Sequence, residues 1–215
     1  MAPPQLILLD AVGTLFGPRA SIGELYRQQA AHHGVRVAAE PLQAAFARAF
    51  AAAPPLAFPH APPEAIAPHE YRWWRAVTSS AFAQVGAREA FADFEAFFSQ
   101  LYAFFGRAEP WYCYPEVRPA LERWRQRGIA LGVVSNFDSR LHAVLAALGM
   151  DALFDSVTVS SRVGAAKPNA RIFWAALHWH GVPASRAWHV GDSLEADYRG
   201  AQACGLRAFW LQRSR

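Results

Sequence analysis

The stretch Leu6-Ile7-Leu8-Leu9-Asp10-Ala11-Val12-Gly13-Thr14 decides how this chain folds. It begins with a continuous apolar run, which is typical of a strand buried on both faces of a parallel sheet. The run ends at Asp10 and turns through Gly13-Thr14. A carboxylate placed directly after a buried strand loses hydration, and that cost usually demands a partner for the charge. The sequence therefore predicts a buried strand that delivers a functional carboxylate.

A regular alternation of strand-like and helix-like segments fills the second half of the chain. Short apolar runs alternate with segments of helical spacing, and the connections between them are short. This rhythm predicts an α/β fold, a doubly wound parallel sheet with helices on both faces. The expected strands after the first are 129–134, 156–160, 187–190 and 207–211, and the expected helices are 117–127, 140–148, 170–180 and 198–204.

Residues 18–107 interrupt this pattern with a segment that carries no clear strand signal. The segment is rich in alanine and in aromatic residues at helical spacing, which predicts a helical insertion. Its middle, residues 53–68, contains too many prolines for a helix and is predicted to be an irregular loop. We therefore expect a core domain made of residues 1–17 and 108–215, with the helical insertion between its two parts.

Polar side chains follow three of the predicted strands. Asp10, the pair Ser135-Asn136 and Asp192 each come directly or shortly after an apolar run. Because ligands of open parallel sheets bind beyond the carboxyl ends of the strands, these residues should meet at one edge. Lys167 is the only lysine among the 21 basic residues, and all the others are arginine. A lysine retained against that background suits a task that needs a compact ammonium charge.

Composition narrows the classes of function. The chain has 215 residues, of which 53% are apolar, enough for a sizeable core. Its net charge of +4 comes from arginines that are spread along the chain, which argues against nucleic-acid binding. No apolar run approaches the roughly 20 residues of a membrane helix, and the chain does not begin with a signal-type segment. We expect a cytoplasmic protein without a membrane partner, and a monomer by default.

Four short motifs occur in order along the chain. They are Asp10-Ala11-Val12-Gly13-Thr14, Ser135-Asn136, Lys167-Pro168, and Gly191-Asp192-Ser193 followed by Asp197. Each motif is weak alone, but together, on a matching strand pattern, they resemble the haloacid dehalogenase superfamily of hydrolases, which are mainly phosphatases. The resemblance implies a Rossmann-like core. It also implies that the insertion is a helical cap that closes over the site and selects small soluble substrates.

The resemblance assigns a role to each motif residue. Asp10 would be the nucleophile and Lys167 would neutralise the phosphoryl oxygens together with that nucleophile. The implied Mg²⁺ ligands are the carboxylates of Asp10 and Asp192 and the backbone carbonyl of Val12. The implied phosphate-binding residues are Thr14, Ser135, Asn136 and Lys167, with help from amides of the first loop. Asp197 would orient ligands or water near the metal, although by sequence alone it could equally be the N-cap of the following helix.

Val12 departs from the pattern of the superfamily. Its phosphatases normally carry a second Asp at this position, which protonates the leaving group and then activates the hydrolytic water. A valine transfers no proton, and general acid–base help is typically worth about 10²–10⁴ in rate. Nothing in the sequence selects a substitute from the candidates Arg19, Glu24, His60 and His69.

This departure leaves three functions open. The first is a magnesium-dependent phosphatase that acts on a small phosphorylated metabolite through an aspartyl-phosphate on Asp10. The second is a metal-independent 2-haloacid dehalogenase, which needs no general acid because halide leaves unprotonated. The third is a non-catalytic protein that binds a phosphorylated ligand or a partner. We favour the phosphatase, because clustering Asp10, Asp192 and Asp197 without a cation would be costly.

Restoring the missing acid tests the phosphatase hypothesis. The substitution Val12→Asp is expected to raise the hydrolysis rate of an alkyl phosphate by about 10²–10⁴, because an alkoxide leaving group needs a proton. An aryl phosphate with an activated leaving group serves as the control and should gain less. Steady-state hydrolysis rates check this, and no gain with Mg²⁺ binding intact would count against a phosphatase that merely lacks its acid.

Overall fold

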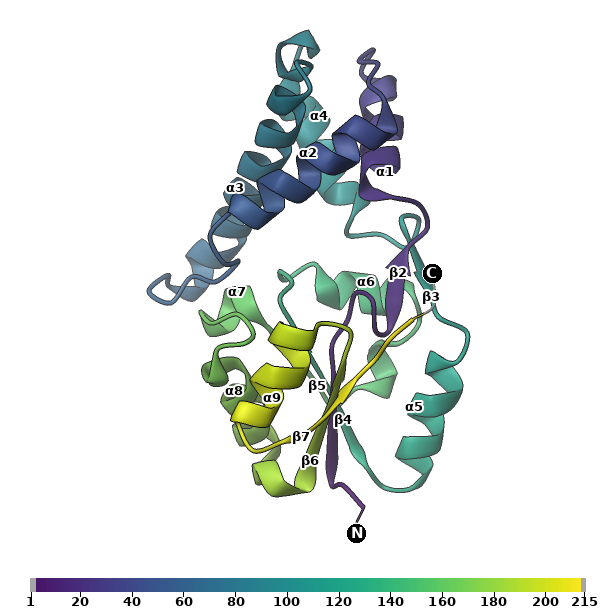
Figure 1. Cartoon of the computed structure of the whole chain (residues 1–215), viewed down its shortest axis with the longest axis vertical. Helices are drawn as coiled ribbons and strands as arrows, with labels where there is room; N and C mark the ends of the chain where they lie inside the picture. Colours follow the sequence, from purple (N-terminus) through teal and green to yellow (C-terminus); the bar gives the residue numbers. More distant parts are fainter. Residues whose placement is uncertain (1–2, 214–215) are drawn as a thin grey trace.

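A five-stranded parallel sheet forms the centre of the computed structural model, which describes residues 3–213 (Figure 1). Its strands lie in the order β5-β4-β1-β6-β7, so the first strand of the chain lies in the middle. The strands are β1 (Leu6–Leu9), β4 (Ala130–Ser135), β5 (Ser156–Val159), β6 (Ala187–Gly191) and β7 (Arg207–Trp210), and all neighbours pair in parallel. The predicted α/β fold class is confirmed.

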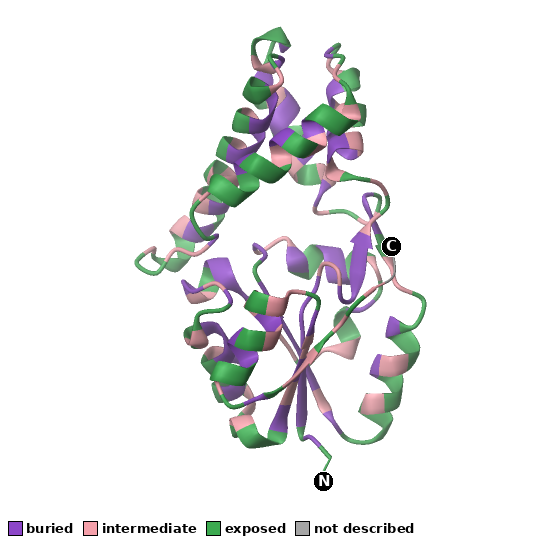
Figure 2. Ribbon diagram, in the orientation of Figure 1, coloured by how far each residue is buried: buried purple, intermediate pink, exposed green. Residues whose placement is uncertain are grey.

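Helices cover both faces of this sheet, because successive residues of a strand point to opposite sides. Ile7 and Leu9 of β1 belong to the core cluster that also contains buried residues of α5 (Val117–Gln126) and α6 (Leu141–Ala147). Leu6 and Leu8 belong to a second cluster with α8 (Ala170–His180) and α9 (Gly200–Ala203). Figure 2 shows the sheet as the buried centre of this domain. Burial on both faces explains why the strand is apolar at every position.

The insertion is a group of four helices above the carboxyl edge of the sheet (Figure 1). They are α1 (Ile22–His32), α2 (Ala39–Ala52), α3 (Pro63–Gln84) and α4 (Phe94–Phe104). Two short antiparallel strands, β2 (Phe16–Pro18) and β3 (Trp111–Cys113), carry the chain out of the core and back. The sequence did not indicate this strand pair. Among the described residues, no helix has both the length and the apolar character to cross a membrane.

The proline-rich middle of the insertion differs from the prediction. The irregular loop ends at Pro62, and α3 already begins at Pro63 and contains Pro68. Proline is favoured in the first turn of a helix, where its missing N–H would have no partner in any case. Pro68 lies further inside and removes one hydrogen bond from a helix of 22 residues. The remaining short elements are a helical turn, α7 (Ser160–Val163), three 3₁₀ turns (Arg88–Ala90, Asp151–Leu153, Ala184–Arg186) and a π-helical segment (Leu194–Arg199).

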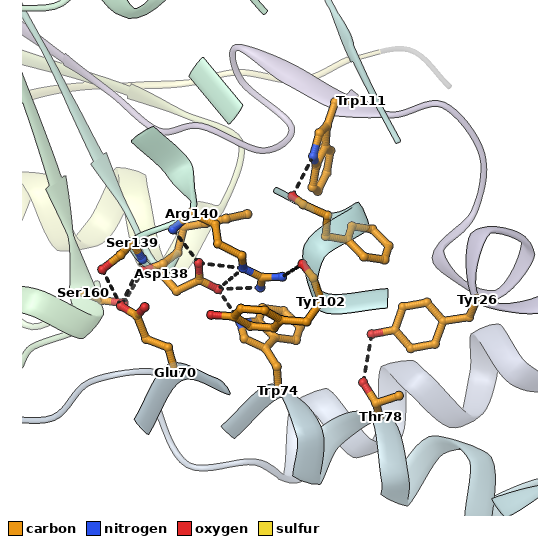
Figure 3. Close-up of polar contacts among 12 residues, drawn as sticks. Tyr26, Glu70, Trp74, Thr78, Tyr102, Trp111, Asp138, Ser139, Arg140 and Ser160 are labelled. Carbon is orange, nitrogen blue, oxygen red and sulfur yellow. Dashed lines mark hydrogen bonds and ion pairs between the residues drawn. The ribbon is translucent and has the colours of Figure 1, made fainter. Parts of the chain in front are cut away.

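The insertion is fastened to the core by buried polar contacts on the loop that follows β4 (Figure 3). Trp74 of α3 donates its indole N–H to the fully buried Asp138, at 2.5 Å. Arg140 also binds Asp138, and it donates to the backbone carbonyl of Tyr102 on α4 at 2.7 Å. Beside this loop, Ser160 of α7 donates its hydroxyl to the Leu56 carbonyl at 2.6 Å. The proline-rich loop and α3 therefore rest directly on the core.

Glu70 is the second buried carboxylate of this junction. It belongs to α3, is 1% exposed, and accepts hydrogen bonds from the Ser139 amide (3.0 Å) and hydroxyl (2.7 Å). Hydrogen bonds to a buried charge are stronger than neutral ones, and a buried donor that loses its partner keeps its full desolvation cost. Glu70 thus fixes how α3 sits on the loop after β4.

The substitution Glu70→Gln should lower the free energy of unfolding by about 1–3 kcal/mol, because it removes the charge that the two Ser139 donors stabilise. Glu95→Gln is the matched control: Glu95 pairs with Arg75 at the surface, and such pairs are worth about 0–1 kcal/mol. Urea denaturation measures both, and equal losses in the two variants would show that Glu70 does not have this role.

Candidate active site

The carboxyl ends of three neighbouring strands bring predicted site residues to one edge of the sheet. Asp10 directly follows β1, Ser135 is the last residue of β4, and Asp192 directly follows β6. Since β4 and β6 flank β1, these three residues are adjacent. Asp10 and Ser135 are buried, at 7% and 4% exposure, whereas Asp192 is exposed. The edge is therefore a buried site with an opening to solvent at Asp192.

Lys167 connects two of the predicted carboxylates. Its ammonium Nζ donates to Asp10 Oδ1 and to Asp197 Oδ1, each at 2.6 Å, and its side chain is 2% exposed. Burial alone would lower the pKa of Lys167, but the charges of Asp10 and Asp197 outweigh burial and raise it above the usual range. The lysine is thus held in its charged form beside the predicted nucleophile.

Asn136 holds the loop that carries this lysine. Its side-chain amide donates to the Lys167 carbonyl at 2.9 Å, and its side-chain oxygen accepts from the Lys167 backbone N–H at 2.7 Å. Both ends of the Asn136 amide are therefore engaged by one peptide segment. This positioning contact was not anticipated from the sequence, which indicated only a phosphate-binding role for Asn136.

Three carboxylates converge beside Lys167. One oxygen each of Asp10, Asp192 and Asp197 lies within 4.8 Å of the others. Partial burial and then the neighbouring charges of Asp10 and Asp197 raise the pKa of Asp192 to about 6. Clustered carboxylates resist ionisation unless a positive charge balances them. The cluster is therefore a candidate cation site.

Asp197 has no oxygen left without a protein partner. Its Oδ1 accepts from Lys167 and lies 2.9 Å from His189 Nε2, while its Oδ2 accepts from the Ser193 amide at 3.0 Å. Burial opposes ionisation, yet the His189 hydrogen bond and the Lys167 charge hold the pKa of Asp197 at about 2. These contacts favour an orienting role over direct metal binding. The alternative that Asp197 is an N-cap is wrong, because Ser193 caps this helical segment.

His189 is a site residue that the sequence analysis missed. It lies in β6, is fully buried, and burial lowers its pKa, so the neutral imidazole donates to Asp197 through Nε2. Its position in an otherwise apolar strand gave no local signal, because the partner side chain lies eight residues further along the chain.

Two glycines make the close approach of these loops possible. A Cβ on Gly13 would lie 2.2 Å from Asp192 Oδ2, and Gly13 has a φ of +89°, which other residues rarely adopt. A Cβ on Gly191 would lie 2.2 Å from the Asp197 carboxyl carbon. A larger residue at either position would therefore clash with the aspartate that packs against it.

The loop after Asp10 presents unused polar groups. The Thr14 hydroxyl is buried without a hydrogen-bond partner. Within residues 3–213, the amides of Ala11 and Val12, the carbonyl of Val12 and the hydroxyl of Ser135 also make no hydrogen bond. A buried polar atom is rarely left unpaired, so the Thr14 hydroxyl, with the unused groups beside it, marks a place for a ligand. Carboxylate and carbonyl oxygens are the ligands that Mg²⁺ prefers, and donors of this kind suit phosphoryl oxygens.

Comparisons with known proteins agree with this arrangement. Residues 4–205 match the family described as haloacid dehalogenase-like hydrolase. The haloacid dehalogenase-like hydrolase domain-containing protein 3 of Bos taurus is 35% identical over 206 residues, which cover 95% of this chain and 80% of the relative. A phosphoserine phosphatase of Thermus thermophilus is 38% identical over 112 residues, or 52% of this chain and 45% of the relative. The structure of a 2-haloacid dehalogenase from Pseudomonas syringae superposes with a TM-score of 0.62 at 26% identity, covering 96% of this chain and 86% of that one.

The raised pKa of Asp192 predicts a pH-dependent effect of the substitution Asp192→Asn in metal-free protein. Because the folded state favours the protonated acid, ionised Asp192 costs stability above about pH 6. The variant should therefore be more stable than the parent at pH 7.5, by about 1 kcal/mol after allowance for solvent screening. This gain should shrink as the pH falls through 6 towards 4.

Denaturation in the presence of a chelator at several pH values measures this difference. Asp151→Asn, at an exposed carboxylate outside the cluster, is the control and should show no such trend. A loss of stability in Asp192→Asn at pH 7.5, or a gain that does not depend on pH, would contradict the assignment of charge repulsion to this cluster.

Proposed function

The chain belongs to the haloacid dehalogenase-like hydrolase family and is a hydrolase, and we propose that it is a magnesium-dependent phosphatase of small phosphorylated metabolites. The charge balance of the site carries this proposal. Three carboxylates converge and one ammonium accompanies them, so these four side chains carry a net charge of two negative units when all are ionised. A divalent cation balances that excess of negative charge, and the similarity to a phosphatase over half of the chain supports the same reaction class.

The site residues fit such an ion. Asp10 and Asp192 would hold it with their carboxylates, and the Val12 carbonyl is unused by the protein. The remaining ligands would be water, as is usual for Mg²⁺. When bound, the ion would supply positive charge that offsets the repulsion between the carboxylates and a phosphate.

Asp10 is the proposed nucleophile. One of its carboxylate oxygens attacks phosphorus, the bond from phosphorus to the leaving oxygen breaks, and the electron pair departs with that oxygen. Lys167 and the unused donors of Ala11, Thr14 and Ser135 hold the phosphoryl oxygens. Water then attacks the phosphorus of the aspartyl-phosphate, which releases inorganic phosphate and restores Asp10.

Proton transfer is the step for which this site has no evident group. The Val12 side chain packs against the core cluster. Glu24, one candidate substitute, is bound by Arg27 and Gln28 on α1, and the Arg27 hydrogen bond in particular lowers its pKa to about 2. It is thus ionised near neutral pH and has no proton to give. Substrates whose leaving group departs without a proton, such as acyl or aryl phosphates, should react best.

The insertion is the proposed cap and would bind the organic part of the substrate. A groove between the insertion and the core ends at Asn136 and the Lys167 loop. Its walls include Phe50, Trp73 and the proline-rich loop, and of the described residues that line it only Lys167 is charged. A neutral, partly apolar organic group suits this groove, because the Lys167 ammonium is already paired with Asp10 and Asp197 and leaves no counter-charge for a charged group.

Hydrolysis of 4-nitrophenyl phosphate with and without Mg²⁺ tests the proposed function. The activated leaving group needs little protonation, so turnover should appear despite Val12 and should depend on Mg²⁺. Asp10→Asn should abolish turnover, whereas Asp151→Asn, outside the cluster, should retain it. Mg²⁺ binding without turnover would favour a phospho-ligand binder. An absence of Mg²⁺ binding would reject the proposal, and release of chloride from 2-chloropropionate would then establish the dehalogenase instead.

A further inference from the structure

Residues 210–213, at the end of β7, contact both loops that carry the predicted metal ligands. We call this segment the C-terminal clasp. The first of the two loops follows β1 and contains Asp10, and the second follows β6 and contains Asp192. None of the four motifs of the sequence includes the clasp.

Arg213 binds the first loop. Its guanidinium donates from Nε to the Gly13 carbonyl at 2.9 Å and from Nη2 to the Thr14 carbonyl at 2.7 Å. The planar group is itself held in place, since Cζ lies 3.4 Å from the centre of the Tyr114 ring and Nη1 pairs with Glu116. Arginine presents several donors in a rigid fork, so one side chain can fix two successive carbonyls.

Trp210 and Leu211 bind the second loop. The Leu211 amide donates to the Gly191 carbonyl at 2.8 Å, which continues the pairing of β7 with β6. The Trp210 indole N–H donates to the Asp192 carbonyl at 2.9 Å, although the residue is 43% exposed. The exposed Trp210 side chain therefore contributes a hydrogen bond to the second loop in addition to its packing.

The two loops approach each other closely, and their carboxylates repel each other. Contacts from outside the loops are therefore needed to keep them in place. Gly13 leaves no room for a side chain against Asp192 Oδ2. The carboxylates of Asp10 and Asp192 carry like charges, and no side chain of the described residues donates a hydrogen bond to the Asp192 carboxylate. The Lys167 ammonium contacts Asp10 and Asp197 but not Asp192. Beside the Ser193 amide, which donates to Asp197, the contacts at the Gly191 and Asp192 carbonyls are thus the restraints on the second loop.

We propose that Arg213 and Trp210 are positioning residues that hold the Asp10 and Asp192 loops in register and so pre-form the magnesium site. The metal part of this inference rests on the proposed function. The mechanical part concerns only the backbone of the two loops and holds for the protein without metal.

Hydrogen exchange of metal-free protein, followed by mass spectrometry, tests the mechanical part. In Arg213→Met, peptides covering residues 11–16 should exchange about tenfold faster, because the loop loses both carbonyl contacts. Arg213→Lys should lie in between, since one ammonium cannot reproduce the fork. Trp210→Phe should accelerate exchange in residues 191–198 and also in residues 11–16, which Trp210 does not touch.

Arg118→Met is the matched control, because Arg118 also pairs with a glutamate and donates to a backbone carbonyl, but from α5. It should leave both loops unchanged. Unchanged exchange in Arg213→Met and Trp210→Phe would overturn the proposal, as would acceleration spread evenly over the whole chain, which would indicate general destabilisation.

Titration calorimetry with Mg²⁺ tests the metal part. Arg213→Met should weaken Mg²⁺ binding by about 10- to 100-fold, as is typical when groups that orient metal ligands are lost, while Arg118→Met should bind like the parent. Faster loop exchange with unaltered Mg²⁺ affinity would overturn the link to the metal. If the parent protein binds no Mg²⁺, the proposed function fails, and the exchange data still decide whether the clasp holds the loops.

Discussion

The ammonium of Lys167, shared between Asp10 and Asp197, is the interaction on which the site depends. A buried charge is tolerated only where partners compensate its lost hydration, and here the ammonium compensates both carboxylates while they compensate it. The surrounding contacts serve this arrangement. Asn136 fixes the backbone of Lys167. His189 and the Ser193 amide form the other hydrogen bonds to the Asp197 carboxylate. Asp10 therefore meets a positive charge on one side and keeps its other side for a ligand.

The fold separates the source of stability from the source of geometry. Apolar side chains from both faces of β1 supply the burial that stabilises the core, but apolar contact is not directional. Direction comes from buried polar groups at the rim of the sheet and at the junction with the insertion, where Asp138, Arg140 and Glu70 have defined partners. Such groups contribute little net stability, but a buried polar group that loses its partner is costly. They therefore favour one arrangement of insertion and core.

Sequence reasoning reached the fold and the motif residues because their signals are local. A four-residue apolar run indicates β1, and polar residues at the strand ends indicate the edge of the sheet where the site lies. What it missed depends on partners distant in the chain. His189, Glu70 and Arg213 look like ordinary polar residues until the fold brings Asp197, Ser139 and the Gly13 carbonyl to them. The start of α3 was missed for a different reason, since a proline-rich run was interpreted as a loop although proline suits a first helical turn.

The order of strands has a consequence for how the chain reaches this structure. Both neighbours of β1 come from the second half of the chain, and Asp10 is 157 residues from Lys167. The insertion, in contrast, packs α1 on α2 and α2 on α3, each next to its neighbour in sequence. During synthesis the helices can therefore associate first, while β1 waits as an exposed apolar segment until β4 and β6 have emerged. The stretch that decides the fold is thus made before the strands that pair with it, and it is among the last segments to find its partners.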